Sequence, residues 1–140
     1  MADQMELAWL AGFVDGEGCV CITKDAPRHE LVLRICNTNR ESILEAARIG
    51  GGKIETYVSQ QNPRNKPAYS VRWGNHKALA LLKLLRPLLR IKGPQVDVAI
   101  EFMTAMPHVG RVGPLRLTVE EIMKREEMRL KMRALNKRGS

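Results

Sequence analysis

A local pattern occurs twice within residues 7–73 and limits the folds that are open to this chain. In each copy, a segment with helical periodicity is followed by two runs that are rich in β-forming residues. In the first copy, apolar residues recur at steps of three and four over residues 7–14, which predicts a short helix that stops at Gly16 and Gly18. The runs 19–24 and 30–37 then flank a short turn, which predicts a β-hairpin.

The second copy follows the same order. Thr38 and Glu41 have the spacing of a capping box, which predicts a helix that ends at the glycine run 50–52. The runs 53–60 and 68–73 are separated by a polar, proline-containing loop, which predicts a second hairpin. Two such units favour an α+β fold, in which a four-stranded antiparallel sheet packs its apolar face on the helices.

Further helices are expected in the second half of the chain. Asn75 has the position of a cap for a leucine-rich helix over residues 76–85. Another helix is expected from Pro94, at its first position, to about residue 105. A capping box opens a last, charged helix over about residues 118–136. We therefore expect the 140 residues to form one domain with the element order αββαββα, followed by further helices.

The charge of the chain is strongly positive, because 23 Lys and Arg stand against 15 Asp and Glu, a formal net charge of +8. A polyanion is therefore the expected partner. A membrane surface is the competing interpretation, but no apolar run approaches the roughly 18 residues that span a bilayer. The basic C-terminal segment also carries several acids. We expect a soluble intracellular protein that binds nucleic acid, and its compartment stays open.

The cysteines and histidines carry little chemistry by their spacing. Cys19, Cys21 and Cys36 are an odd number without a CxxC pair, so neither a disulfide framework nor a zinc site is expected. Cys19 and Cys21 would point to the same face of a strand. The three histidines have no Ser, Cys or acid partner at motif spacing, so nucleophilic catalysis has no support.

Residues 10–18 have the sequence LAGFVDGEG, which combines features that are unusual in a helix. Gly12 costs about 1 kcal/mol relative to Ala in a helix interior, and Gly16 follows four residues later. Close approach of a second helix would explain both glycines. Asp15 and Glu17 lie at the C-terminal end, where the helix macrodipole disfavours negative charge, so something cationic should offset them. The alternative is a helix that stops at glycines and exposes two solvated acids.

This segment closely resembles the LAGLIDADG motif of homing endonucleases, with Glu17 in place of the second Asp. The resemblance extends through about Met106 and implies the endonuclease fold of that family. A single motif implies a homodimer that cuts a long, nearly palindromic double-stranded DNA target. It also implies that Glu17, assisted by the Gly16 carbonyl, binds Mg²⁺ or another divalent cation such as Mn²⁺. The residues expected to contact the second copy are Leu7, Leu10, Ala11, Gly12 and Asp15.

Two further positions match catalytic sites of the family by local alignment. Lys92 corresponds to a basic residue that lies beside the scissile phosphate, and Asn39 to a polar residue, often Gln, that orders the catalytic water. Each position has a simpler interpretation. Asn39 could cap the following helix, and Lys92 could be one more solvated charge in a basic loop.

The sheet is expected to read the DNA, because a two-stranded ribbon fits the major groove, where Arg commonly meets guanine. Period-two alternation predicts the strand residues on the groove side. Basic residues in or near the hairpin loops would reach the DNA backbone. The predicted strand contacts are Thr23, Glu30, Arg34, Lys53, Glu55, Tyr57, Ser70 and Arg72, and the predicted loop contacts are Lys24, Arg28, Arg64 and Lys66.

Two other classes of function compete with DNA cleavage. A non-cutting relative of the same fold could assist RNA splicing as a maturase or act as a DNA-binding regulator, and the charge of +8 is compatible with both. A structural or interaction protein is the third class. The presence of Glu17 favours cleavage. No membrane and no small-molecule substrate are expected.

Overall fold

The structure is a computed structural model of the chain, and it describes residues 2–25, 28–57, 67–105 and 117–138. The elements of the first half follow the predicted order of helix, hairpin, helix, hairpin. They are α1 (Gln4–Glu17), β1 (Gly18–Asp25), β2 (Arg28–Asn37), α2 (Arg40–Gly50), β3 (Lys53–Tyr57) and β4 (Ala68–Gly74). The second half consists of α3 (Asn75–Leu85), the 3-10 turn η1 (Arg86–Leu88), α4 (Gly93–Ala105) and α5 (Val119–Arg138). The predicted α+β class is confirmed.

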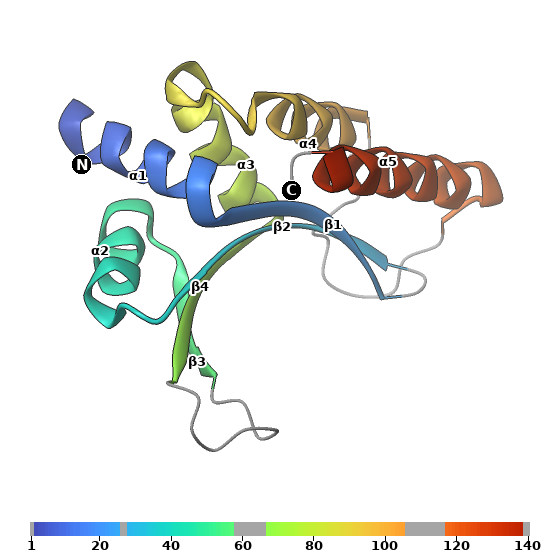
Figure 1. Cartoon of the computed structure of the whole chain (residues 1–140). Helices are drawn as coiled ribbons and strands as arrows, with labels where there is room; N and C mark the ends of the chain where they lie inside the picture. The colour runs from blue at the N-terminus through green and yellow to red at the C-terminus, as the bar shows by residue number, and fades with distance from the viewer. Residues whose placement is uncertain (1, 26–27, 58–66, 106–116, 139–140) are drawn as a thin grey trace.

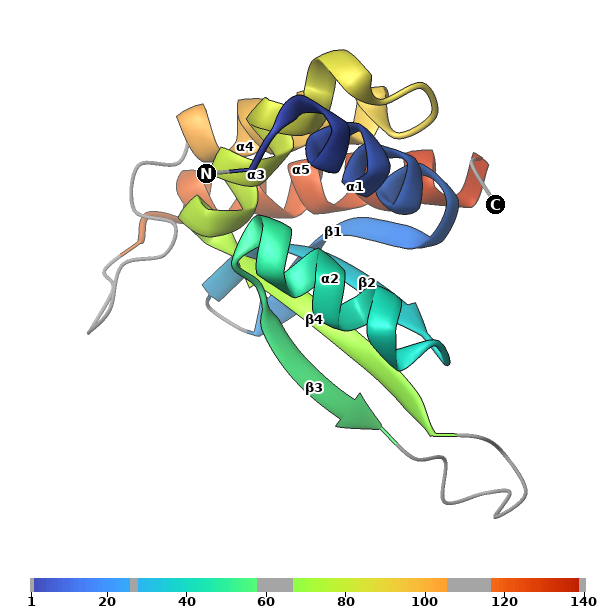
Figure 2. The ribbon, with the colours of Figure 1, turned by 90° about the vertical axis from the view of Figure 1, so that its left-hand side faces the viewer.

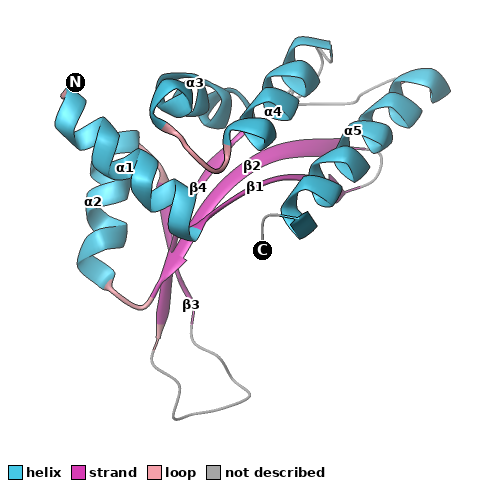
Figure 3. Cartoon of the chain, turned by 45° about the horizontal axis from the view of Figure 1, so that its top comes forward, coloured by secondary structure: helices cyan, strands magenta, loops and turns pink. Residues whose placement is uncertain are grey.

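The four strands form one antiparallel sheet in the order β1-β2-β4-β3. The two hairpins therefore meet in the middle, where β2 pairs with β4 and Arg34 lies opposite Arg72. The sheet is strongly curved, and the helices lie on its convex side (Figure 1). No described helix covers the concave face. Turned views place α2 along β4 and α5 near β1 (Figures 2 and 3), in agreement with the contacts between these elements.

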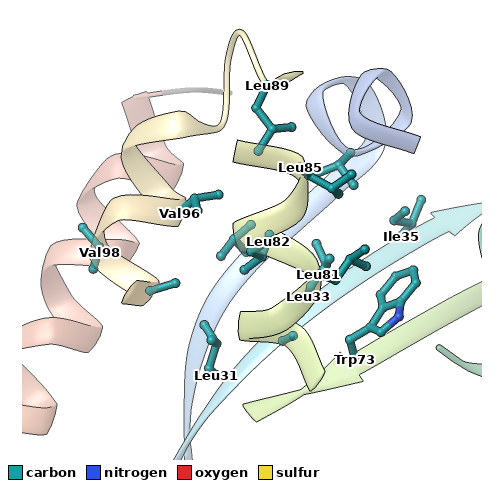
Figure 4. Close-up of a cluster of buried hydrophobic side chains, with 14 of the residues drawn as sticks. Leu31, Leu33, Ile35, Trp73, Leu81, Leu82, Leu85, Leu89, Val96 and Val98 are labelled. Atoms are coloured by element: carbon teal, nitrogen blue, oxygen red, sulfur yellow. The ribbon is translucent and has the colours of Figure 1, made fainter. Parts of the chain in front are cut away.

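The core lies between the sheet and the helices (Figure 4). Alternation along β2 buries Leu31, Leu33 and Ile35 on the helix side of the sheet, where α1, α2 and α3 contact this strand. Trp73 is buried as well, and its indole N–H donates a hydrogen bond to the Gly50 carbonyl over 2.8 Å, which ties the end of α2 to β4. The helix α2 ends at Gly51, whose φ of 73° is the left-handed conformation that favours glycine.

Two helix caps differ from the sequence predictions. Asn39, and not Thr38, caps α2, because its side-chain oxygen accepts the Ser42 N–H over 2.8 Å. Asn75 does not cap its own helix: it has a φ of 50°, and its side-chain oxygen accepts the Leu31 N–H over 3.0 Å, beyond the end of the β2–β4 ladder. In both cases, the side chain of an Asn at a chain reversal accepts a nearby backbone N–H that lacks another partner.

The C-terminal helix begins as predicted. The Thr118 hydroxyl accepts the Glu121 N–H over 3.1 Å and caps α5. The helix crosses the edge strand β1, where the Asn136 amide donates to the Val20 carbonyl over 2.8 Å. None of the helices in the described ranges is long and apolar enough to span a bilayer.

Candidate active site and nucleic-acid interface

The last turn of α1 passes directly into β1, and this junction holds the two acids of the motif. The Gly18 N–H donates to the Val14 carbonyl and closes the helix. A Cβ at position 18 would lie 2.6 Å from that carbonyl oxygen, so only glycine allows so abrupt a change from helix to strand. The junction therefore presents Gly16 and Glu17 at the surface, at the end of the sheet where β1 begins.

Asp15 is fully engaged within the chain. Its carboxylate accepts hydrogen bonds from the backbone N–H groups of Arg90, Ile91 and Lys92, over 2.8, 3.1 and 3.0 Å. Burial raises the pKa of Asp15, but these hydrogen bonds and the charge of Lys92 outweigh it and hold the pKa below its usual value. The predicted compensation of the acid is thus supplied mainly by backbone donors.

Glu17 differs from Asp15 in its exposure and in its contacts. It is exposed, and no hydrogen bond or ion pair to it is formed among the described residues. Its neighbour Gly16 is also exposed, and its carbonyl belongs to the last turn, where carbonyls have no partner within the helix. Glu17 and Gly16 can therefore offer oxygen atoms to a ligand without breaking a contact of the fold.

Lys92 lies beside this junction, although 75 residues separate it from Glu17 in the sequence. Its backbone is bonded to Asp15, and the Lys92 carbonyl accepts the Val96 N–H over 3.1 Å in the first turn of α4. The side chain is half-buried and close enough that its charge helps to lower the pKa of the Cys19 thiol. The predicted pair Glu17 and Lys92 is thus brought to one place.

Asn39 is less well suited to the predicted catalytic role, because its side-chain oxygen is used in the α2 cap. The alternative of a capping residue describes its geometry. Asn37 lies closer to the junction by strand register, since Gly18 pairs with Ile35 and the next residues of β2 continue towards α1. Its side-chain oxygen accepts the Asn39 N–H over 2.8 Å. Local alignment selects Asn39, two residues further along the chain, and not Asn37.

The strand register gives the concave face of the sheet the composition that alternation predicted. Thr23 pairs with Glu30, Arg34 with Arg72, and Lys53 with Arg72 from the other side. Thr23, Arg34, Lys53 and Glu55 are exposed. Arg34 forms no ion pair with any described carboxylate, so its guanidinium is available to a ligand. Lys24 and Arg28 are exposed at the β1–β2 turn, and Lys24 lies 3.8 Å from Glu126.

Other predicted contacts are occupied or outside the described residues. Glu30 forms an ion pair with Arg72, so each neutralises the other. Ser70 is a correction: it is buried and its hydroxyl donates to the Glu55 carbonyl over 3.5 Å, which leaves little for a partner. Tyr57 pairs with Ala68 in the backbone register, but its side chain lies outside the described part, as do Arg64 and Lys66.

The shared strand face of Cys19 and Cys21 was predicted from the sequence, but their cationic neighbours were not. Cys19 and Cys21 lie on the concave side of β1, opposite Arg34 and Val32. A hydrogen bond with Cys21, together with the charges of Lys92 and Arg34, lowers the pKa of the Cys19 thiol to about 6. The signal was present in the sequence, since the two cysteines are spaced to share a strand face. Their cationic neighbours come from other elements.

The chain is similar to known proteins in its structure. No protein-family model and no curated protein matches the sequence. Among solved structures, the homing endonuclease I-CvuI in complex with DNA is similar, with 21% sequence identity and a TM-score of 0.73 over 94% of this chain and 82% of that one. The archaeal intron-encoded homing endonuclease I-Vdi141I complexed with DNA is similar with 15% identity and a TM-score of 0.73, over 96% and 86%. For the LAGLIDADG meganuclease I-AabMI bound to uncleaved DNA the values are 23% and 0.64, over 88% and 43%.

The chain has the fold of the LAGLIDADG homing endonucleases. The segment that resembles the LAGLIDADG motif forms α1, and the burial of its residues corrects two of the predicted dimer contacts. Leu10 and Ala11 are buried in the core of the same chain, Leu7 packs against that core, and the Asp15 carboxylate is turned to the 90–92 backbone. Leu10 and Ala11 were therefore wrong as interface residues, because the helix uses its most apolar stripe to pack on its own sheet. The exposed stripe consists of Met5, Ala8, Trp9, Gly12 and Gly16.

Proposed function

We propose that the protein is a site-specific endonuclease for double-stranded DNA that acts as a homodimer and uses divalent cations held by Glu17 of both subunits. The contrast between the two acids of the LAGLIDADG motif carries this proposal. Asp15 accepts three backbone hydrogen bonds, whereas the exposed Glu17 has no hydrogen bond or ion pair among the described residues. An exposed carboxylate without a structural partner, beside a cationic face, is suited to bind a metal ion.

The concave face of the sheet supports DNA as the partner. It is free of described helices. It carries Arg34, which forms no ion pair with a described carboxylate, in its centre and Lys53 on its outer strand. Arginine is the commonest partner of guanine in the major groove, and lysine commonly contacts phosphate. The structures similar to this fold include several that are described as complexes with DNA. We infer that this face lies in the major groove.

The exposed stripe of α1 supports a second copy as the other partner. Trp9 and Met5 are 42% and 83% exposed, although both are apolar. A Cβ at Gly12 or Gly16 would meet no atom of the chain within 4 Å, so the chain's own packing does not require glycine at these positions. Glycines spaced four apart on a helix allow another helix to approach closely, and a two-fold axis would bring the same stripe of a second subunit there.

The donor set of a single chain fits a shared metal site. Within the described residues, no group of three or more His, Cys, Asp or Glu side chains is arranged to hold a metal ion. Two Glu17 carboxylates, two Gly16 carbonyls and phosphate oxygens would supply the oxygen ligands that Mg²⁺ or Mn²⁺ prefers. When bound, such cations activate water and stabilise the charge that develops at phosphate. In this proposal, the Lys92 ammonium donates hydrogen bonds to a phosphate oxygen or to its solvent.

The test begins with the target, which selection of bound duplexes from a randomised DNA library would provide. We expect the wild-type protein to cut both strands of the selected site in Mg²⁺ or Mn²⁺. Glu17→Gln should abolish cleavage and keep the DNA dissociation constant within about tenfold, because binding rests on the basic face. Glu127→Gln, the same change at an exposed acid of α5, is the matched control.

Two results would refute the proposal in different ways. Cleavage by Glu17→Gln at the wild-type rate would show that this residue is not needed to bind the catalytic metal ion. Binding of the selected duplex without cleavage by the wild-type protein in either cation would identify a non-cutting relative of the same fold. Competition of that binding by structured RNA at equal concentration would then favour a maturase.

A further inference from the structure

The loop between η1 and α4 is hydrogen-bonded to one side chain of α1. Arg90, Ile91 and Lys92 turn three successive backbone N–H groups towards the Asp15 carboxylate, over distances of 2.8 to 3.1 Å. Three charge-assisted hydrogen bonds converge on one carboxylate, and bonds of this kind are stronger than those between neutral groups. Asp15 therefore determines where this loop lies relative to the last turn of α1.

The position of the acid is costly in α1 and favourable for α4. A carboxylate near the C-terminus of a helix is disfavoured by about 0.3 to 1 kcal/mol. The same carboxylate lies just before the N-terminus of α4 (Gly93–Ala105), where negative charge is favoured. Lys92 is bonded on both sides, since its N–H donates to Asp15 and its carbonyl accepts from Val96 over 3.1 Å. The Lys92 backbone is thus held between the two helices.

This attachment joins the two groups that the proposed function requires. Glu17 follows Asp15 by two residues in the same helix, so one turn of α1 carries both the proposed metal ligand and the anchor of Lys92. We propose that Asp15 is a positioning residue, which holds the Lys92 ammonium in register with Glu17 through the backbone of residues 90–92. This inference rests on the proposed function of Glu17 and Lys92 as members of one cleavage site.

A purely structural role for Asp15 would also involve these hydrogen bonds, so the experiment has to separate the two. We compare Asp15→Asn, Lys92→Ala and the double variant on the selected DNA site, and measure the single-turnover cleavage rate and the dissociation constant of each. Asp15→Asn keeps the size of the side chain but turns a donor NH₂ towards a backbone donor. We expect its cleavage rate to fall about 10- to 100-fold, since a misplacement of about 1 Å can have that effect. The dissociation constant should change by less than about threefold.

Coupling between the two residues is the decisive measurement. If Asp15 acts through Lys92, the double variant should cut no more slowly than Lys92→Ala alone. Hydrogen exchange provides a readout that is independent of cleavage, and the amides of residues 90–92 should exchange at least about tenfold faster in Asp15→Asn. Asp97→Asn is the matched control, because Asp97 of α4 accepts hydrogen bonds from Arg86 of η1 over 2.9 and 3.0 Å and so links the two elements that flank the same loop. General loosening of the loop would therefore appear in this variant as well.

The outcomes separate the inference from the proposed function. Additive losses in the double variant, or unchanged exchange at residues 90–92, would overturn the positioning role while leaving Glu17 and Lys92 in place. A Lys92→Ala variant that cuts at the wild-type rate would overturn the inference together with the catalytic role of Lys92. If Asp15→Asn is unfolded by circular dichroism, Asp15→Ser, whose hydroxyl oxygen can accept one of the three N–H groups, undergoes the same comparison.

Discussion

Replacing Gly12 with leucine should separate the stability of the single chain from that of the dimer. Gly12 is exposed in the middle of α1, and a Cβ built there meets no atom within 4 Å. Leucine is a better helix former than glycine by roughly 0.5 to 1 kcal/mol. The free energy of unfolding of the isolated chain should therefore stay constant or rise by that amount, although most substitutions are destabilising.

The stability of the dimer should change in the opposite direction, and by more. Helices that pack through glycine approach to about 8 Å, and larger side chains at the contact increase the separation to about 10 Å. An overpacked position costs about 1 to 3 kcal/mol, and in a two-fold symmetric dimer both subunits carry the substitution in the interface. The expected loss of roughly 2 to 6 kcal/mol corresponds to a dimer dissociation constant raised roughly 30-fold to 10⁴-fold.

Sedimentation velocity over a series of concentrations gives the dissociation constant, and thermal unfolding of dilute protein gives the stability of the chain. Ala134→Leu adds similar bulk at an exposed helical position of α5 and should leave the dimer intact. Cleavage of both strands should be lost together with the dimer. The reasoning fails if Gly12→Leu dimerises like the wild type, or if the wild type is a monomer at the concentration at which it cuts both strands.

The remaining predictions concern the concave face. Arg34→Ala should weaken binding of the selected site by about 1 to 3 kcal/mol and relax the preference at one base pair of each half-site. Lys53→Ala should weaken the binding of all DNA sequences alike and lower the salt dependence of the binding constant by about one unit. Binding of both variants to a library in which every position of the site is varied distinguishes these effects. Unchanged base preferences in Arg34→Ala would disprove the groove contact. Because the pKa of Cys19 is lowered to about 6, its thiolate is present above that pH, so alkylation by iodoacetamide should rise through pH 6 and then level off. Bound DNA should slow this reaction and Cys19→Ser should remove it, whereas equal rates with and without DNA would contradict the placement of Cys19 on the DNA face.

Local sequence patterns were sufficient for the elements and for one face of the sheet. Residues 7–14 have a helical period and residues 30–37 a period of two, and both became the expected element because a repeating pattern of burial is a property of neighbouring residues. The same alternation predicted that Arg34 and Lys53 would share a face. Where two candidates for a cap lay side by side, as with Thr38 and Asn39, the local pattern could not decide between them.

The amino-acid sequence was enough to predict the order of helices and hairpins, the basic character of the chain and the position of Glu17 at the end of a helix. Which surface of α1 is free became clear from the packing, because the apolar stripe with Leu10 could have faced either the chain's own sheet or a second helix, and it packs on the sheet while Gly12 is exposed. The tertiary structure also decided the partner of Asp15, a loop 75 to 77 residues away. Periodicity reports the conformation of a segment, whereas such a contact depends on how distant segments pack, and no local spacing records that.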